Sequence, residues 1–117
     1  MKYKTIICAL IICILLDTSL IEMKPPIDTK EYVGTYELTA YIATGNACAD
    51  GVYPQVGYTA ACNDKRLWHK KIHIEGYGDY YIHDTGGMAN NVIDIFVGSY
   101  DEAIQFGRRT AEVYIID

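Results

Sequence analysis

Tyr80-Tyr81-Ile82-His83-Asp84-Thr85-Gly86-Gly87, followed by Val92-Ile93-Asp94-Ile95-Phe96, is the stretch that decides the fold. Each half is rich in β-branched and aromatic residues, and a Gly-Gly turn lies between them, so we predict two strands that each carry one aspartate. Alternation along a strand puts Asp94 on the face of Val92 and Phe96, and it puts Asp84 on the face of Ile82.

The apolar surroundings of Asp94 favour a chemical role. Burial penalises a carboxylate anion, so the pKa of such an acid rises toward the range in which it can donate a proton near neutral pH. Aspartates also accept backbone N–H bonds at strand ends. Both interpretations of Asp84 and Asp94 are open on spacing alone.

Five further segments complete the predicted secondary structure. Ser99 and Glu102 form a capping box for a helix that runs to about Phe106, with Gly107 as its C-terminal cap and Arg108 and Arg109 beside its negative end. The predicted strands are residues 36–42, 58–62, 71–75, 80–83, 91–97 and 111–116. Six short strands and one helix favour a mainly β fold, a small closed barrel that hides its strand edges.

Composition limits the class of protein. Half of the 117 residues are hydrophobic, and there are 11 tyrosines, 10 glycines and only 3 prolines, which is typical of one small, turn-rich β domain. The net charge of -5 and the absence of a basic stripe argue against a nucleic-acid partner.

The N-terminus differs from the rest of the chain. Lys2 and Lys4 precede an apolar segment, residues 5–16, that Asp17 ends. This pattern predicts a signal peptide or signal anchor over residues 1–21, a linker over 22–35 and a folded domain over 36–117. We therefore expect an exported protein, secreted or attached to the cell envelope, that touches the membrane only through its N-terminal segment.

The cysteines follow the same division. Export makes a disulfide between Cys48 and Cys62 plausible. A zinc site is not expected, because these cysteines and the scattered histidines show neither a C-x-x-C pair nor a paired-histidine spacing.

Several ordered motifs resemble the 3D domain, named for three aspartates, of bacterial cell-wall proteins. The resemblance spans roughly residues 36–116. The motifs are Leu38-Thr39-Ala40-Tyr41, Ile72-His73-Ile74-Glu75-Gly76-Tyr77-Gly78, His83-Asp84-Thr85-Gly86-Gly87, Ile93-Asp94-Ile95-Phe96 and Glu102-Ala103-Ile104-Gln105-Phe106-Gly107-Arg108-Arg109. The resemblance implies a six-stranded double-psi β-barrel related to the catalytic part of membrane-bound lytic transglycosylase A and to stationary-phase muralytic proteins.

The resemblance also assigns the aspartates. The second family aspartate falls on Asp84 and the third on Asp94. An ungapped match puts Cys62 at the first position and a short gap puts Asp64 there, and we assign Asp64 because only a carboxylate keeps the charge. The family's Pro-Leu-Gly turn is missing from residues 65–71 of this chain, so the groove is expected to differ in shape.

The implied activity is lytic transglycosylation of peptidoglycan glycan strands, which needs no cofactor. The C6 hydroxyl of N-acetylmuramic acid attacks its own C1 and leaves a 1,6-anhydro end, with one carboxyl group as acid and then base. Asp94 is the predicted acid and base, with Asp84 and Asp64 tuning its pKa. The residues expected to line the groove are Thr39, Tyr41, Gly86 and Gly87.

Three other interpretations remain. A glycan-binding module could keep the barrel without activity, which the altered segment 62–71 favours. The Asp84-Thr85-Gly86 sequence also matches the loop of retroviral-type aspartic proteases, although no second motif of that class is evident. Finally, three acids could hold a divalent cation.

Overall fold

The computed structural model describes residues 30–117. The predicted signal segment, and the predicted linker up to residue 29, lie outside these residues. No helix within the described part of the chain is long and apolar enough to cross a membrane. The elements are β1 (Glu31–Tyr41), β2 (Thr59–Cys62), the 3-10 helix η1 (Lys65–Leu67), β3 (Lys71–Ile74), β4 (Gly78–Asp84), β5 (Val92–Phe96), α2 (Tyr100–Phe106) and β6 (Arg109–Ile115).

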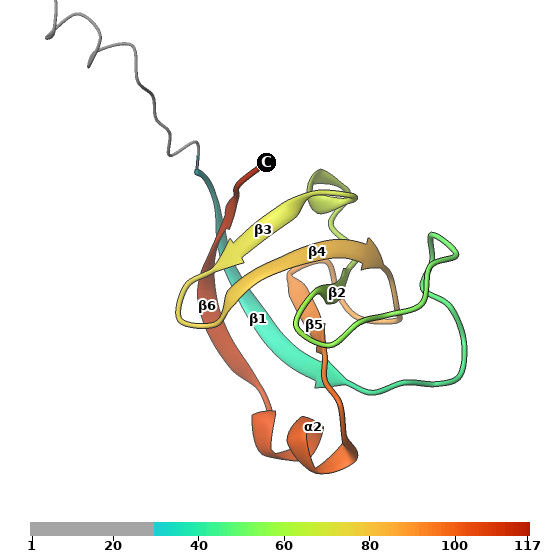
Figure 1. Cartoon of the computed structure of the whole chain (residues 1–117). Coiled ribbons are helices and arrows are strands. Elements are labelled where there is room, and N and C mark those ends of the chain that lie inside the picture. Colours follow the sequence, from blue (N-terminus) through green and yellow to red (C-terminus); the bar gives the residue numbers. More distant parts are fainter. Residues whose placement is uncertain (1–29) are drawn as a thin grey trace, which may run out of the picture.

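The six strands form a closed barrel in the order β1-β5-β2-β4-β3-β6, which confirms the predicted mainly β barrel with one short helix (Figure 1). β1 pairs in parallel with β5, and β2 pairs in parallel with β4. The other four neighbouring pairs are antiparallel. Because the sheet closes on itself, it has no exposed edge.

The first strand is longer than predicted. β1 begins at Glu31, so the prediction of a linker up to residue 35 is wrong for residues 31–35. These residues pair with the end of β6, and the register shifts between Tyr32 and Gly34. Gly34 has a φ of 137°, which side-chain-bearing residues rarely adopt, and this kink lets the strand continue around the barrel. The other five strands lie within two residues of their predicted ends.

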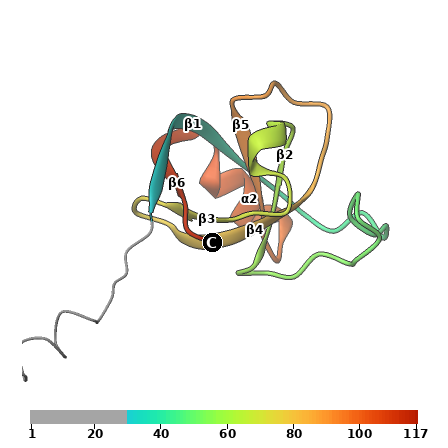
Figure 2. The ribbon, with the colours of Figure 1, turned by 90° about the horizontal axis from the view of Figure 1, so that it is seen from above.

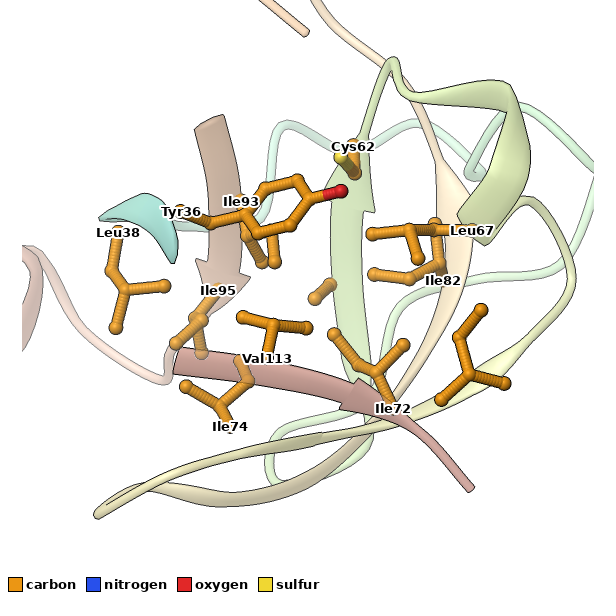
Figure 3. Packing of buried hydrophobic residues seen from close by; sticks show 12 residues of the cluster. Tyr36, Leu38, Cys62, Leu67, Ile72, Ile74, Ile82, Ile93, Ile95 and Val113 are labelled. Atoms are coloured by element: carbon orange, nitrogen blue, oxygen red, sulfur yellow. The ribbon is translucent and has the colours of Figure 1, made fainter. Parts of the chain in front are cut away.

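The core fills the barrel interior. Side chains from every strand meet there (Figure 3). Leu38, Ile93 and Val113 have no exposed surface. Ile93 and Ile95 face the core while Asp94 between them does not, as the predicted alternation requires. Burial of these aliphatic groups, at about 25 cal/mol per Å² of apolar surface, is the main stabilising term.

Helix α2 has the predicted caps. The Ser99 hydroxyl accepts a hydrogen bond from the Glu102 N–H at 3.2 Å, and Gly107 ends the helix with a φ of 63°. The Arg109 side chain donates to the Phe106 carbonyl at 2.8 Å, beside the negative end of the helix. Arg108 instead pairs with Glu37 on β1 at 2.6 Å.

Ser99→Ala should lower stability without changing the carboxylate site. The substitution removes the acceptor for one otherwise unpaired helix N–H and should cost about 1 kcal/mol of unfolding free energy. Chemical denaturation followed by circular dichroism measures this loss. Ser99→Asp keeps an acceptor and should behave like the native chain, whereas a Ser99→Ala variant of native stability would show that the cap contributes nothing.

Candidate functional site

Strand β2 brings the two aspartates of the motif together. Ala61 on β2 is the register partner of Asp84 on β4 and of Asp94 on β5. Asp94 is also the partner of Thr39 on β1. The two carboxylates therefore stand on the two strands that flank β2, on the outer face of the barrel wall.

A register shift turns Asp84 onto this face. β2 and β4 pair Ala60 with Ile82 and then Ala61 with Asp84, so His83 is one extra residue in β4. Ile82 belongs to the buried core, and regular alternation would have turned Asp84 toward it. The prediction that Asp84 shares a face with Ile82 is therefore wrong. Bulges of this kind redirect side chains beside functional sites.

Both carboxylates border one cavity of about 320 Å³. The loop that follows β1 forms much of its wall; this loop, residues 42–58, is drawn in green and extends away from the barrel in both views (Figures 1 and 2). Its lining residues are Tyr41, Ile42, Ala43, Thr44, Asn46, Ala47, Pro54, Ala61, Asp84, Thr85, Gly86, Met88 and Asp94. The cavity can admit a ligand that reaches both acids.

Asp94 is a half-buried acid that accepts a hydrogen bond from the neighbouring strand β1. Its Oδ1 accepts the Thr39 hydroxyl at 2.9 Å. Burial raises the pKa of Asp94 above its ordinary value, and the negative charge of Asp84 raises it further. The Thr39 hydrogen bond and the Arg108 charge act in the opposite direction on this pKa but do not reverse it. Asp94 thus has the character expected of a proton donor.

Asp84 is held as a hydrogen-bond acceptor. Its Oδ2 accepts the Tyr41 hydroxyl at 2.9 Å, and its Oδ1 accepts the backbone N–H of Ala49 at 2.9 Å. The Thr85 N–H lies at the same distance from Oδ1. Donors from two separate segments fix the orientation of this carboxylate, as a positioning or charge-tuning group requires.

Asn63 holds the Gly-Gly turn in place. Its amide nitrogen donates to the carbonyls of Gly86 at 2.8 Å and Met88 at 2.7 Å, and its oxygen accepts the Gly86 N–H at 3.2 Å. These three bonds fix one wall of the cavity. Sequence reasoning missed this role, because an amide that pairs with a distant backbone segment leaves no local pattern.

A buried histidine anchors the loop that carries Ala49. His83 is 1% exposed; its Nε2 lies 2.9 Å from the Thr59 hydroxyl and its Nδ1 lies 3.1 Å from the Asp50 carboxylate. Thr59 in turn accepts the Gln55 N–H at 2.9 Å. The network connects two points of the loop to the barrel, and sequence reasoning also missed it.

Asp64, predicted as the third carboxylate of the site, lies outside the cavity. It caps η1 by accepting the Arg66 N–H at 3.0 Å, forms an ion pair with the Arg66 guanidinium at 2.9 Å and accepts the Tyr36 hydroxyl at 2.6 Å. The hydrogen bond from the Arg66 side chain is the largest cause that lowers the pKa of Asp64 to about 2. The hydrogen bonds and the ion pair with Arg66 keep Asp64 ionised, and Asp64 does not line the cavity that contains Asp94.

The predicted disulfide is absent, because Cys48 and Cys62 are both free and buried. Cys62 faces the core, next to outward-facing Ala61, and its thiol lies 3.7 Å from the Asn90 carbonyl. The loop that carries Cys48 covers the opposite face of β2, where burial and then the charge of Asp84 raise the pKa of the Cys48 thiol to about 11. Strand alternation thus separates the two thiols.

Two of the four residues expected to line the groove border the carboxylate cavity. Tyr41 and Gly86 line the cavity, whereas Thr39 and Gly87 do not. Thr39 acts on Asp94 directly, and the Tyr41 ring packs edge-on against Phe96 with ring centroids 5.3 Å apart. Within residues 30–117 no group of three or more histidine, cysteine or acidic side chains is arranged to hold a metal ion.

Comparison with known proteins shows a partial similarity to a cell wall-binding protein. No protein-family model matches the chain. A segment of 48 residues is 40% identical to the cell wall-binding protein YocH of Bacillus subtilis (strain 168). The match covers 40% of this chain and 17% of the length of YocH, so the chain corresponds to less than a fifth of that relative.

Proposed function

We propose that this chain is a peptidoglycan-cleaving lytic transglycosylase of the 3D type, with double-psi connectivity in its barrel and a location at the cell envelope. One observation carries the proposal: Asp94 is half-buried with a raised pKa, and it shares an open cavity with the fixed carboxylate of Asp84. The similarity to a cell wall-binding protein supports the choice of the wall glycan as ligand.

The proposed reaction needs only one proton-transferring group. Protonated Asp94 donates its proton to the glycosidic oxygen as the bond from that oxygen to C1 of N-acetylmuramic acid breaks. The C6 oxygen of the same sugar then bonds to C1, and ionised Asp94 takes the proton from that hydroxyl. No water is consumed, and the second carboxylate that glycoside hydrolases use as nucleophile or base is not required.

Asp84 supports this step through charge. It raises the pKa of Asp94 and so keeps a larger fraction of that acid protonated at a given pH. Hydrogen bonds from the Tyr41 hydroxyl and the Ala49 N–H fix the orientation of the Asp84 carboxylate in the cavity. Asp84 is thus a positioning residue for the acid.

The direct test is digestion of purified cell-wall sacculi by the full-length chain. Mass spectrometry of the released fragments should find 1,6-anhydromuramic acid ends, which are one water lighter than reducing ends. Reducing ends would instead identify a hydrolase, which needs a second catalytic carboxylate. Release of peptides with intact glycan would place the cleavage outside the sugar chain.

A non-catalytic glycan-binding module is the second candidate. It is favoured by the position of Asp64, which leaves two acids in the cavity where the resemblance implies three. Sedimentation with sacculi separates the two functions. A binding module co-sediments with intact sacculi and releases no fragments, while the transglycosylase releases anhydro fragments.

Asp84→Asn should move the pH profile of cleavage toward acid. Cleavage requires protonated Asp94, so the rate falls as the pH rises through the pKa of that acid. Removing the Asp84 charge lowers this pKa, and the falling limb of kcat/KM should move to lower pH.

Thr39→Val serves as the opposed control. It removes a hydrogen bond that lowers the pKa of Asp94, so the falling limb should move to higher pH. Profiles of both variants, measured on soluble glycan fragments, check the assignment. Shifts in the same direction, or no shift, would contradict a role of Asp94 as the acid.

A further inference from the structure

A second cavity lies beside the carboxylate cavity. Its volume is about 390 Å³, and Thr85 borders both cavities, so a ligand that extends past Asp84 along this residue enters the second one. Its lining residues are Cys62, Asn63, Asp64, Lys65, Trp68 and Thr85. Cavities of this size with one large aromatic side chain and a few polar groups are typical of small-molecule subsites.

Trp68 is held in place by neighbouring rings. Its indole stacks on the His69 ring with centroids 4.4 Å apart and planes at 20°. His69 in turn stacks on Tyr81 with centroids 5.9 Å apart and planes at 8°. Trp68 also packs against the buried core, so its orientation is fixed before any ligand arrives.

The strained backbone at His69 places its ring against Trp68. Its φ is 59°, and among the described residues it is the one non-glycine residue with a positive φ. A hydrogen bond from its N–H to the Ile82 carbonyl at 2.8 Å holds the turn. Such strain persists where the surrounding structure requires the conformation, and strained residues are often found at ligand sites. Here the turn sets the Trp68 and His69 rings against each other.

Some polar side chains of the second cavity are bonded within the protein, and one is in no ion pair with the described residues. Asn63 is bonded to the Gly-Gly turn and Asp64 is bonded to Arg66. Lys65 lines the cavity and takes part in no ion pair within residues 30–117, so its ammonium group has no carboxylate partner there. The cavity thus presents an aromatic wall beside a hydrogen-bond donor, which suits a ring with an apolar C–H face and polar substituents.

We propose that this second cavity is a glycan subsite that binds one N-acetylhexosamine ring on the indole of Trp68, next to the bond that is cut at Asp94. The subsite rests on the proposed function, because it takes its ligand from the same glycan strand. Pyranose rings present flat C–H faces that pack on aromatic rings, and Lys65, which lines the same cavity, would donate hydrogen bonds to the oxygen substituents of the same sugar. The substrate is therefore a glycan chain of at least two sugars rather than a single monosaccharide.

Intrinsic fluorescence tests this proposal directly, because the chain contains one tryptophan. The full-length Asp94→Asn variant, which is expected to bind without cutting, is titrated with a peptide-free tetrasaccharide of alternating N-acetylglucosamine and N-acetylmuramic acid. We expect a saturable change in the emission of Trp68. In the same background, Trp68→Leu should weaken tetrasaccharide binding about tenfold in calorimetry.

Two further variants keep the test decisive. Trp68→Phe retains a ring and should bind with an affinity between those of the Asp94→Asn background and the Trp68→Leu variant, even if Trp68→Leu folds poorly. Tyr100→Leu removes an exposed aromatic residue of α2 that lines neither cavity and should bind like the background.

The outcomes separate the subsite from the activity. Tetrasaccharide binding with unchanged Trp68 emission and unchanged affinity in Trp68→Phe overturns the subsite and leaves the transglycosylase proposal intact. A saturable emission change in a native chain that releases no fragments supports the subsite and overturns the activity. Absence of tetrasaccharide binding overturns the subsite, and sacculus digestion then decides the activity alone.

Discussion

Asp94→Asn is expected to reduce the release of anhydromuropeptides to background while the barrel stays folded. Asparagine keeps the shape of the side chain and can still accept the Thr39 hydroxyl, but it cannot give or take the proton. Loss of a general acid and base lowers rates by about 100-fold to 10,000-fold. Fragment release from sacculi over time measures the rate, and circular dichroism monitors the fold.

Asp101→Asn is the matched control for this variant. Asp101 lies in the first turn of α2, is exposed and does not line the carboxylate cavity. It should release fragments at the native rate. Native activity in Asp94→Asn would remove Asp94 from the mechanism, and loss of sacculus binding in the same variant would point to a role in holding the glycan.

Leu38→Ala should produce the largest loss of stability. Leu38 has no exposed surface and lies inside the barrel on β1, directly before Thr39. Truncation of a buried leucine costs about 2 to 5 kcal/mol, through lost burial and the cavity that remains. Small domains have about 5 to 15 kcal/mol of unfolding free energy, so a large share is lost. The midpoint of urea unfolding measures this change.

Ile104→Ala tests whether this loss reflects burial. Ile104 is an aliphatic residue of α2 that is 61% exposed. Its truncation should change the unfolding free energy by less than about 0.5 kcal/mol. Equal losses in the two variants would contradict the assignment of Leu38 to the core.

The strands and the helix were predictable because their signals are local. A run of branched residues that ends in an aromatic residue marked β5, and Ser99 and Gly107 marked both ends of α2. The side of β5 that carries Asp94 followed from the alternating direction of side chains along a strand. The convergence of Asp84 and Asp94 on one cavity came from the resemblance, because neither spacing nor composition shows which strands become neighbours.

The wrong predictions concern residues whose positions depend on contacts with distant parts of the chain. His83 is an extra residue in β4, and nothing in the order of residues shows that this bulge turns Asp84 outward. Asp64 caps η1 and pairs with Arg66, and these nearby contacts hold its carboxylate outside the cavity that contains Asp94. Cys62 faces the core because of its position in β2, so its distance from Cys48 depends on the path of the loop.

The carboxylate site is assembled from strands that are far apart in the chain. Thr39 belongs to β1 and Asp94 to β5, and these strands pair in parallel. Such pairing is slow because the chain must lose the entropy of a long loop before the contact is gained. A growing chain that ends before residue 94 contains Asp84 but neither Asp94 nor the β6 strand that closes the barrel. The pair of acids can therefore form only after residue 94 has been made, and the barrel can close only after β6 has been made.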